Sequence, residues 1–280
     1  MIVKQQGFWL LGLLLAGWAA PLCAELWHVV ESDPEKRIWA IRPAADEQAT
    51  SIQVRVGPGD AAIDYTGRTI QGQLVEGQTF FLERIWPADP MQVRLVDNAN
   101  RALRRDTVTR GRQVYRSLGE YLPPFALYNQ QGKLIRPESW RGRYVVLNFI
   151  FTRCQLPEMC PAATMRMGEL QQAAKDAGLE NVQLASITFD AEYDTPGILN
   201  FYASTRGIDP ENFDFLTGSP EAINDLMRQF GIITVNEDDT INHTMGTLLI
   251  SPNGQIIYRR EGSRWSALDF IQRIQAHQTR

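Results

Sequence analysis

Residues 143–151, RYVVLNFIF, restrict the fold of this chain more than any other segment. The run is apolar at nearly every position, whereas a strand with one face in water alternates apolar and polar residues. Such a strand is buried on both faces, and helices must therefore cover both faces of its sheet. A stretch of helical composition begins at Pro161, where proline suits a first turn because its missing N–H would have had no partner. The sequence therefore predicts an α/β sheet with this run as a central strand.

The alternation of strand and helix continues from residue 120 to residue 280. The expected elements are, in order, a hairpin at 123–135, the strand at 143–151, a helix at 161–178, a strand at 182–189, a helix at 195–205, a strand at 213–216, a helix at 219–231, a hairpin at 244–260 and a helix at 264–277. Helices and strands in this order form a sheet covered on both faces. We predict a thioredoxin-like α/β domain over residues 120–280.

Residues 25–97 have a different pattern, with short β-type runs broken by the turn sequences DPEK, GPGD and PADP. Residues 71–85 alternate well enough to form a hairpin that turns at Glu76 and Gly77, and the segment MQVRLVD at 91–97 would be the last strand. We predict a small all-β domain, either a barrel or a sandwich. It would serve as a scaffold or docking module without a metal.

Residues 98–119 join the two predicted domains and are rich in arginine. The segment carries Arg101, Arg104, Arg105, Arg110, Arg112 and Arg116. Runs of like charge usually face water, so we predict a solvated linker or a short helix without a function of its own.

The first 24 residues have the layout of a signal peptide. Lys4 precedes an apolar run from Phe8 to Leu22, and the small residue Ala24 stands before the polar sequence. The run is short for a spanning helix, so we predict export with cleavage after Ala24. An uncleaved membrane anchor is the alternative. Removing Lys4 leaves 27 of the 28 basic residues against 32 acidic ones. This net negative charge does not indicate nucleic acid as a partner.

Two of the three cysteines, Cys154 and Cys160, remain after the predicted cleavage, because Cys23 is removed with the leader. They fall on the loop between the strand at 143–151 and its helix, with Cys160 at the helix start. The positive end of a helix favours thiolate over thiol, and thiolates attack disulfides and bind soft metals. The sequence thus predicts a functional cysteine pair.

His243 is the histidine that we expect near this pair. It precedes the closing hairpin, at the end of an acidic segment predicted to be a loop, and a thioredoxin-like fold brings that junction beside the cysteines. A structural zinc site needs four ligands, whereas two thiolates and one imidazole suit Cu(I) and can also hold Cu(II). We expect His277 to lie at a frayed surface end and His28 to be a partly buried strand residue.

Several motifs together resemble the Sco/SenC family of thioredoxin-like copper proteins. They are FALYNQQGKLI, FIFTRC, a second cysteine followed by proline, ITFDAEYDTPGILNFYA, TGSPEAINDLMRQFG and NHTMGTLLISPNGQI, and they run from about Leu122 to the last helix. The resemblance implies a copper site formed by Cys154, Cys160 and His243. It also implies a metallochaperone that assists assembly of the binuclear CuA centre of cytochrome c oxidase. The partner would be the oxidase subunit carrying CuA or another copper acceptor.

Two further expectations follow from the resemblance. Asp190 matches an acidic residue that the family carries after its second core strand, and it would orient the copper site as a neighbour of the ligands. The implied location is the bacterial periplasm or the outer face of the inner membrane, with membrane association through the N-terminal segment if that segment is not cleaved.

The chain departs from the family pattern in the spacing of its cysteines. The family has three residues between them, as CPxxCP, whereas five intervene here, and Gln155 replaces the first proline. Five residues still allow both sulfurs to reach one metal or to form a disulfide.

The alternative is an exported thiol-disulfide oxidoreductase that uses the same cysteine pair. Thioredoxin-type redox enzymes have a C-x-x-C motif and a cis-proline before the facing strand. This chain has the longer spacing and reads INHTMG at that junction, which favours metal binding. A domain that only binds a partner is the third possibility, and the presence of both cysteines together with His243 speaks against it.

Overall fold

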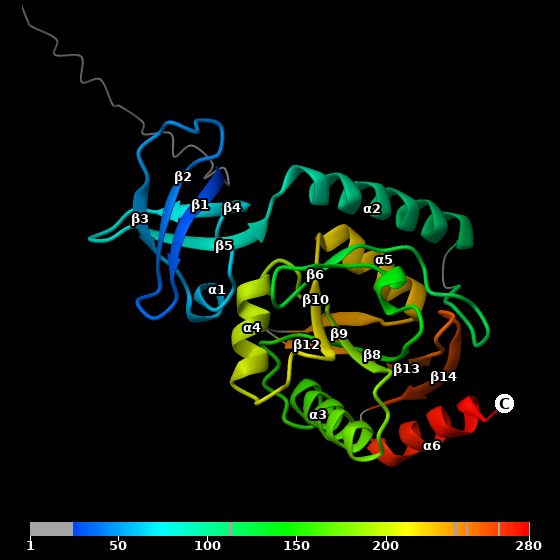
Figure 1. Ribbon diagram of the computed structural model, residues 1–280. Coiled ribbons are helices and arrows are strands. Elements are labelled where there is room, and N and C mark those ends of the chain that lie inside the picture. Colours follow the sequence, from blue (N-terminus) through cyan, green and yellow to red (C-terminus); the bar gives the residue numbers. More distant parts are fainter. Residues whose placement is uncertain (1–24, 112–113, 238–239, 245, 263, 280) are drawn as a thin grey trace, which may run out of the picture.

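The computed structural model describes residues 25–111, 114–237, 240–244, 246–262 and 264–279, without the side chains of residues 235–243. A closed five-stranded barrel lies beside a seven-stranded sheet that is covered by helices (Figure 1). The predicted signal peptide lies outside the described residues. Within the described ranges, no helix combines the length and apolarity needed to cross a membrane.

The barrel is built from the β-type runs of the N-terminal half. Its strands are β1 (Glu25–Asp33), β2 (Ile38–Pro43), β3 (Ile52–Arg55), β4 (Thr69–Val75) and β5 (Phe81–Pro87), arranged in the order β1-β2-β3-β5-β4. Trp39 and Tyr65 are fully buried in its interior. Strands β4 and β5 form the predicted hairpin. The short helix α1 (Pro58–Ala61), which the sequence analysis did not expect, lies between β3 and β4.

The helix α2 (Pro90–Arg110) corrects one prediction and confirms part of another. The segment at 91–97 is the first part of this helix and not a strand. The arginine-rich segment was predicted to be a solvated linker or a short helix, and its residues 98–110 are helical and continue α2. Pro90 occupies the first turn, where its fixed φ favours helix formation. Leu103 and Thr107 are buried four residues apart, one turn along the same face.

The arginine-rich segment also makes more contacts than a solvated run would. Arg104 forms an ion pair of 2.8 Å with Asp225 of helix α5 (Pro220–Phe230). The buried Arg116 donates from Nε to Gln229 Oε1 at 2.7 Å and from Nη1 to the carbonyl of Tyr121 at 2.6 Å. These contacts hold α2 and the segment after it against α5.

The seven-stranded sheet follows the predicted order of elements. Its strands are β6 (Leu127–Asn129), β7 (Leu134–Ile135), β8 (Tyr144–Ile150), β9 (Val182–Thr188), β10 (Phe213–Thr217), β13 (Gly246–Ile250) and β14 (Ile256–Glu261), in the order β14-β13-β8-β9-β10-β6-β7. Strands β8, β9 and β10 are parallel. All seven residues of β8 are buried, as the apolar run predicts.

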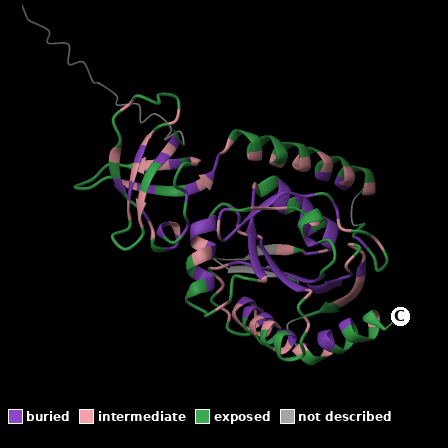
Figure 2. Ribbon diagram, in the orientation of Figure 1, coloured by how far each residue is buried: buried purple, intermediate pink, exposed green. Residues whose placement is uncertain are grey.

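Helices cover both faces of this sheet (Figure 2). One apolar cluster joins the sheet to α2 and α5, and the other joins it to α3 (Cys160–Asp176), α4 (Pro196–Ser204) and α6 (Ala267–Gln278). A short 3-10 helix, η1 (Pro137–Trp140), precedes β8. Helix α5, predicted at 219–231, is capped at both ends: Ser219 accepts from the N–H of Ala222, and Gly231 is left-handed at φ 66°.

The acidic segment before the closing hairpin was expected to be a loop, and this expectation is wrong. Its backbone forms a two-stranded ribbon of β11 (Thr234–Glu237) and β12 (Thr240–His243). Antiparallel pairing of Thr234 with His243 at its base satisfies backbone groups that a loop would expose to water.

Helix α1 of the barrel packs against α4 of the α/β part through two glycines. A Cβ added to Gly59 would lie 1.8 Å from the carbonyl oxygen of Gly197, and one added to Gly197 would lie 2.1 Å from Asp60 Oδ1. Asp60 Oδ1 is buried and has no hydrogen-bond partner among the described residues. Burial raises the pKa of Asp60 to about 7. We call this contact the α1–α4 seam.

The raised pKa of Asp60 predicts that stability falls as pH rises. The folded state favours the protonated acid, so its stabilising contribution is complete below the unfolded pKa near 3.8 and is lost as pH rises through about 7. Between pH 5 and pH 8 the free energy of unfolding should fall by about 2 kcal/mol more in the parent than in Asp60→Asn, which mimics the neutral acid. Urea denaturation at the two pH values measures this difference. Identical pH profiles for parent and variant would contradict it.

Candidate functional site

The two cysteines lie on the loop between β8 and α3, as the sequence predicts. Cys160 is the first residue of α3 and is fully buried, whereas Cys154 is partly exposed. Neither cysteine forms a disulfide. Cys154 Sγ lies 3.8 Å from the carbonyl oxygen of Leu156, a weak contact. The loop thus presents one accessible thiol next to one that is enclosed.

The environment of Cys160 opposes ionisation in the reduced protein. Burial raises the pKa of the Cys160 thiol well above its usual range, and a backbone hydrogen bond from Phe151 offsets only part of this effect. A side-chain hydrogen bond with Cys154 also raises this pKa, so the two sulfurs are in contact. The helix start favours the thiolate, but burial outweighs it here. Any metal that binds Cys160 must therefore displace its proton.

Asp194 is a buried acid beside the cysteine loop that the sequence analysis missed. It accepts hydrogen bonds from the hydroxyl groups of Thr152 and Thr188 and from the backbone N–H of Thr152, the last at 3.2 Å. Burial raises the pKa of Asp194 to about 6, and its charge contributes to the raised pKa of Cys160. Asp194 therefore joins the ends of β8 and β9 directly behind the thiols.

Asp190 lies at the same edge of the sheet but contacts the loop through Arg153. Its Oδ2 accepts from Arg153 Nε at 2.8 Å and from Nη2 at 2.6 Å. The Arg153 guanidinium also lies 4.3 Å from the centre of the Tyr193 ring, a cation–π distance. Since Arg153 directly precedes Cys154, this ion pair fixes the start of the cysteine loop.

The topology brings the backbone of His243 to this edge as well. Strand β13 runs antiparallel to β8, with Leu248 opposite Leu147, so β13 begins where β8 ends. His243 ends β12, three residues before β13. The side chain of His243 lies outside the described residues. Among the side chains that are described, no group of three or more His, Cys, Asp and Glu forms a metal-binding cluster.

Comparison with known proteins decides the family. A model of the SCO1/SenC family matches residues 114–277. The chain belongs to the SCO1/SenC family. The match takes in both cysteines, Asp190, Asp194 and His243, and it leaves the barrel outside.

Individual relatives agree with this assignment. The SCO1 protein homolog of Bacillus subtilis is 31% identical over 165 residues, covering 58% of this chain and 84% of that protein. The mitochondrial SCO2 homolog of Bos taurus is 29% identical over 161 residues, and the match spans only 59% of its length.

Solved structures of the family share the fold of the α/β part. A SCO1/SenC family lipoprotein from Bacillus anthracis has a TM-score of 0.52 at 28% identity, covering 58% of this chain and 98% of that one. BsSco, described as a member of the Sco family of cytochrome c oxidase assembly proteins with a disulfide switch, has a TM-score of 0.51 at 29% identity and covers 59% and 96%.

The other two histidines of this SCO1/SenC protein lie elsewhere. His28 is a partly buried residue of β1, as predicted. His277 was expected to lie at a frayed end of the chain, and this expectation is wrong. It belongs to α6, and its Nδ1 lies 2.8 Å from the hydroxyl of Tyr144 in β8. The docked ring holds the end of the helix against β8. Neither histidine lies on the segments that carry the cysteines.

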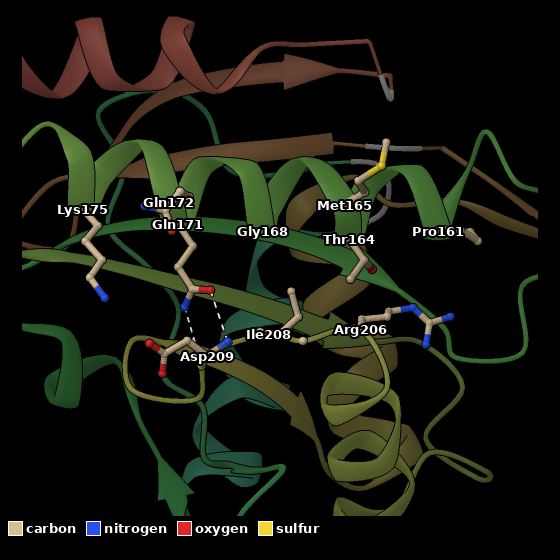
Figure 3. Close-up of a pocket in the computed structure, with 11 residues that line it drawn as sticks. Pro161, Thr164, Met165, Gly168, Gln171, Gln172, Lys175, Arg206, Ile208 and Asp209 are labelled. Carbon is tan, nitrogen blue, oxygen red and sulfur yellow. Dashed lines mark hydrogen bonds between the residues drawn. The ribbon is translucent and has the colours of Figure 1, made fainter.

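A groove of about 440 Å³ runs along α3 from Pro161, the neighbour of Cys160 (Figure 3). Its opposite wall is the loop at 206–209. Gln171 of α3 connects the two walls by donating to the carbonyl of Asp209 at 2.7 Å. The guanidinium of Arg206 stacks 3.6 Å from the centre of the Tyr202 ring. The groove borders the thiol site but contains neither sulfur.

Proposed function

We propose that this protein is a copper metallochaperone that binds one copper ion through Cys154, Cys160 and His243. The observation that carries the proposal is the contact between two thiols that form no disulfide, on the loop from β8 to α3, in a chain of this family. Relatives support it: a 29% identical protein of Stutzerimonas stutzeri, matched over 66% of its length, is described as a putative copper-binding protein. The proposed client is the cytochrome c oxidase subunit that carries CuA, or another copper acceptor.

The donor atoms of this chain fit copper better than zinc. The sequence holds three cysteines and three histidines, and His28 and His277 lie on β1 and α6. A structural zinc site would lack its fourth ligand, whereas two soft thiolates and one imidazole suit Cu(I) and can also hold Cu(II).

The residues around the thiols would hold the cysteine loop in position for metal binding. Binding releases the protons of both thiols, because only the thiolate is a ligand. We assign the ion pair of Asp190 with Arg153 a positioning role at Cys154. Asp194, held by two threonine hydroxyls, would keep the loop at a fixed distance from α4. Neither carboxylate is needed as a ligand.

The N-terminal segment and the barrel would also have roles in this function. Residues 1–24 would be a signal peptide or an uncleaved anchor. The protein would act in the periplasm or at the outer face of the inner membrane. The barrel would form a separate unit that serves as a scaffold or docking module without metal.

An anaerobic titration of the reduced chain with Cu(I), in competition with a chelator, tests the proposal. We expect one copper per chain. His243→Ala should weaken binding about tenfold because it removes one of three donors. The matched control is His28→Ala, a histidine on the barrel, which should leave the affinity unchanged. Equal affinity of His243→Ala and the parent would remove His243 from the site.

The thiol-disulfide oxidoreductase remains the second candidate, because two thiols in contact are also the reduced form of a redox pair. The same preparations distinguish the two functions. If no form of the protein binds copper while the parent reduces a disulfide substrate, the oxidoreductase is correct. If copper binds and reduction of the substrate is no faster than with a small dithiol, the metallochaperone is correct.

A further inference from the structure

Four arginines line a groove of about 790 Å³ in the α/β part. Strand β14 and helix α6, which contribute two of them, lie on the side of this part that is away from the barrel (Figure 1). The four arginines come from three regular elements and one loop. Arg166 belongs to α3, Arg260 to β14 and Arg273 to α6, and Arg264 lies in the loop before α6. Since the whole chain has a net charge of −4, this cluster is not the result of a basic composition.

The charge of this arginine groove is largely unneutralised. Asp269 is the acidic residue in its lining, and it pairs with Arg273 at 3.3 Å. Arg166, Arg260 and Arg264 have no carboxylate partner within the described ranges. The nearby Glu261 is already paired with Arg259. Four guanidinium groups therefore face one carboxylate.

Two buried donors in the lining also lack a partner among the described residues. They are Nε of Arg166 and Nε1 of Trp265, whose side chain is only 5% exposed. A buried N–H without an acceptor is destabilising, and an acceptor supplied by a ligand would satisfy it. The start of α6 at Ala267 adds the positive end of a helix dipole beside the same groove.

The groove is close to the thiol site. Arg166 follows Cys160 by six residues on α3, which corresponds to about 9 Å along a helix axis. Trp265 belongs to the same apolar cluster as Cys160. A partner bound in the groove would therefore contact α3 within about two turns of Cys160.

From these contacts we infer that the arginine groove binds an acidic segment of the protein that exchanges copper with the thiols. This inference rests on the proposed function and names a docking surface for it. Guanidinium groups pair with carboxylates through two parallel hydrogen bonds, and the size of the groove accommodates several carboxylates of one segment. A membrane surface fits less well, because binding in the interface requires an apolar helix face, whereas Leu268 is the one exposed aliphatic residue in the lining.

The test uses the full chain and a fluorescein-labelled hexaglutamate peptide, with fluorescence anisotropy at low salt. The double variant Arg260→Glu with Arg264→Glu reverses two exposed charges of the groove and should weaken binding about tenfold or more. The matched control is Arg101→Glu with Arg105→Glu on α2, which makes the same change in net charge away from the groove. It should change the affinity less than about twofold.

Several results would overturn the inference. They are equal affinity of the reversal variant and the parent, equal binding of hexaglutamine, and binding confined to phosphatidylglycerol vesicles, which would assign the groove to lipid. Copper titration of the same samples separates the two proposals. Normal copper binding without peptide binding overturns the docking groove alone, and peptide binding by a chain that takes up no copper overturns the proposed function.

Discussion

Replacing Cys160 by alanine is expected to weaken copper binding about a hundredfold or more, since a site with three donors loses one of its two thiolates. Cys160 is fully buried, and alanine in its place offers the metal no donor atom. Cys154→Ala should have a similar effect, because the sulfurs of the two residues are in contact and would bind the same ion. Anaerobic competition with a Cu(I) chelator measures both affinities.

The control of the copper titration, His28→Ala on the barrel, serves for this prediction as well and should leave copper binding unchanged. Since Cys160 also contributes to the core of the α/β part, thermal unfolding must be measured on the same sample; loss of one buried sulfur should cost about 1 kcal/mol. A folded Cys160→Ala variant that binds one copper with parental affinity would exclude the thiol pair as the site.

The α/β part was predictable because its signals are local. The run at 143–151 showed a strand buried on both faces, and Ser219 and Gly231 marked the ends of α5. The segment at 91–97 was wrongly predicted to be a strand, because Met91, Val93 and Leu95 alternate with polar residues as in a half-buried strand. These side chains are exposed on α2. Long-range contacts such as the ion pair between α2 and α5 are absent from any local pattern.

The candidate site shows the same division between local and long-range information. The cysteines and the backbone position of His243 followed from the order of strands, which places three separate segments at one sheet edge. Asp194 was not predictable, because one of its hydroxyl partners, Thr152, is 42 residues away in the sequence. The ionisation of Cys160 was also misjudged, since the helix start is visible in the sequence but the depth of burial is not.

Gly197→Ala is expected to destabilise the protein by about 3 kcal/mol, although helix propensity alone predicts a gain of about 0.5–1 kcal/mol for this change. The new Cβ would lie 2.1 Å from Oδ1 of the buried Asp60. Gly59→Ala should be at least as harmful, because its Cβ would lie 1.8 Å from a backbone carbonyl oxygen, which cannot rotate away. Urea denaturation measures both effects as a loss in the free energy of unfolding.

Two other glycines separate this steric effect from general effects of adding a methyl group. Gly168 lies inside α3, where a Cβ would meet only the end of the Ile208 side chain at 3.2 Å, and Gly77 has its nearest contact at 3.5 Å. Alanine at either position should change the free energy of unfolding by less than about 1 kcal/mol. If Gly197→Ala were as harmless as Gly168→Ala, the α1–α4 seam would not be a rigid contact. Because α4 begins two residues after Asp194, a rigid seam fixes the barrel relative to the carboxylate behind the thiols, and a loose one does not.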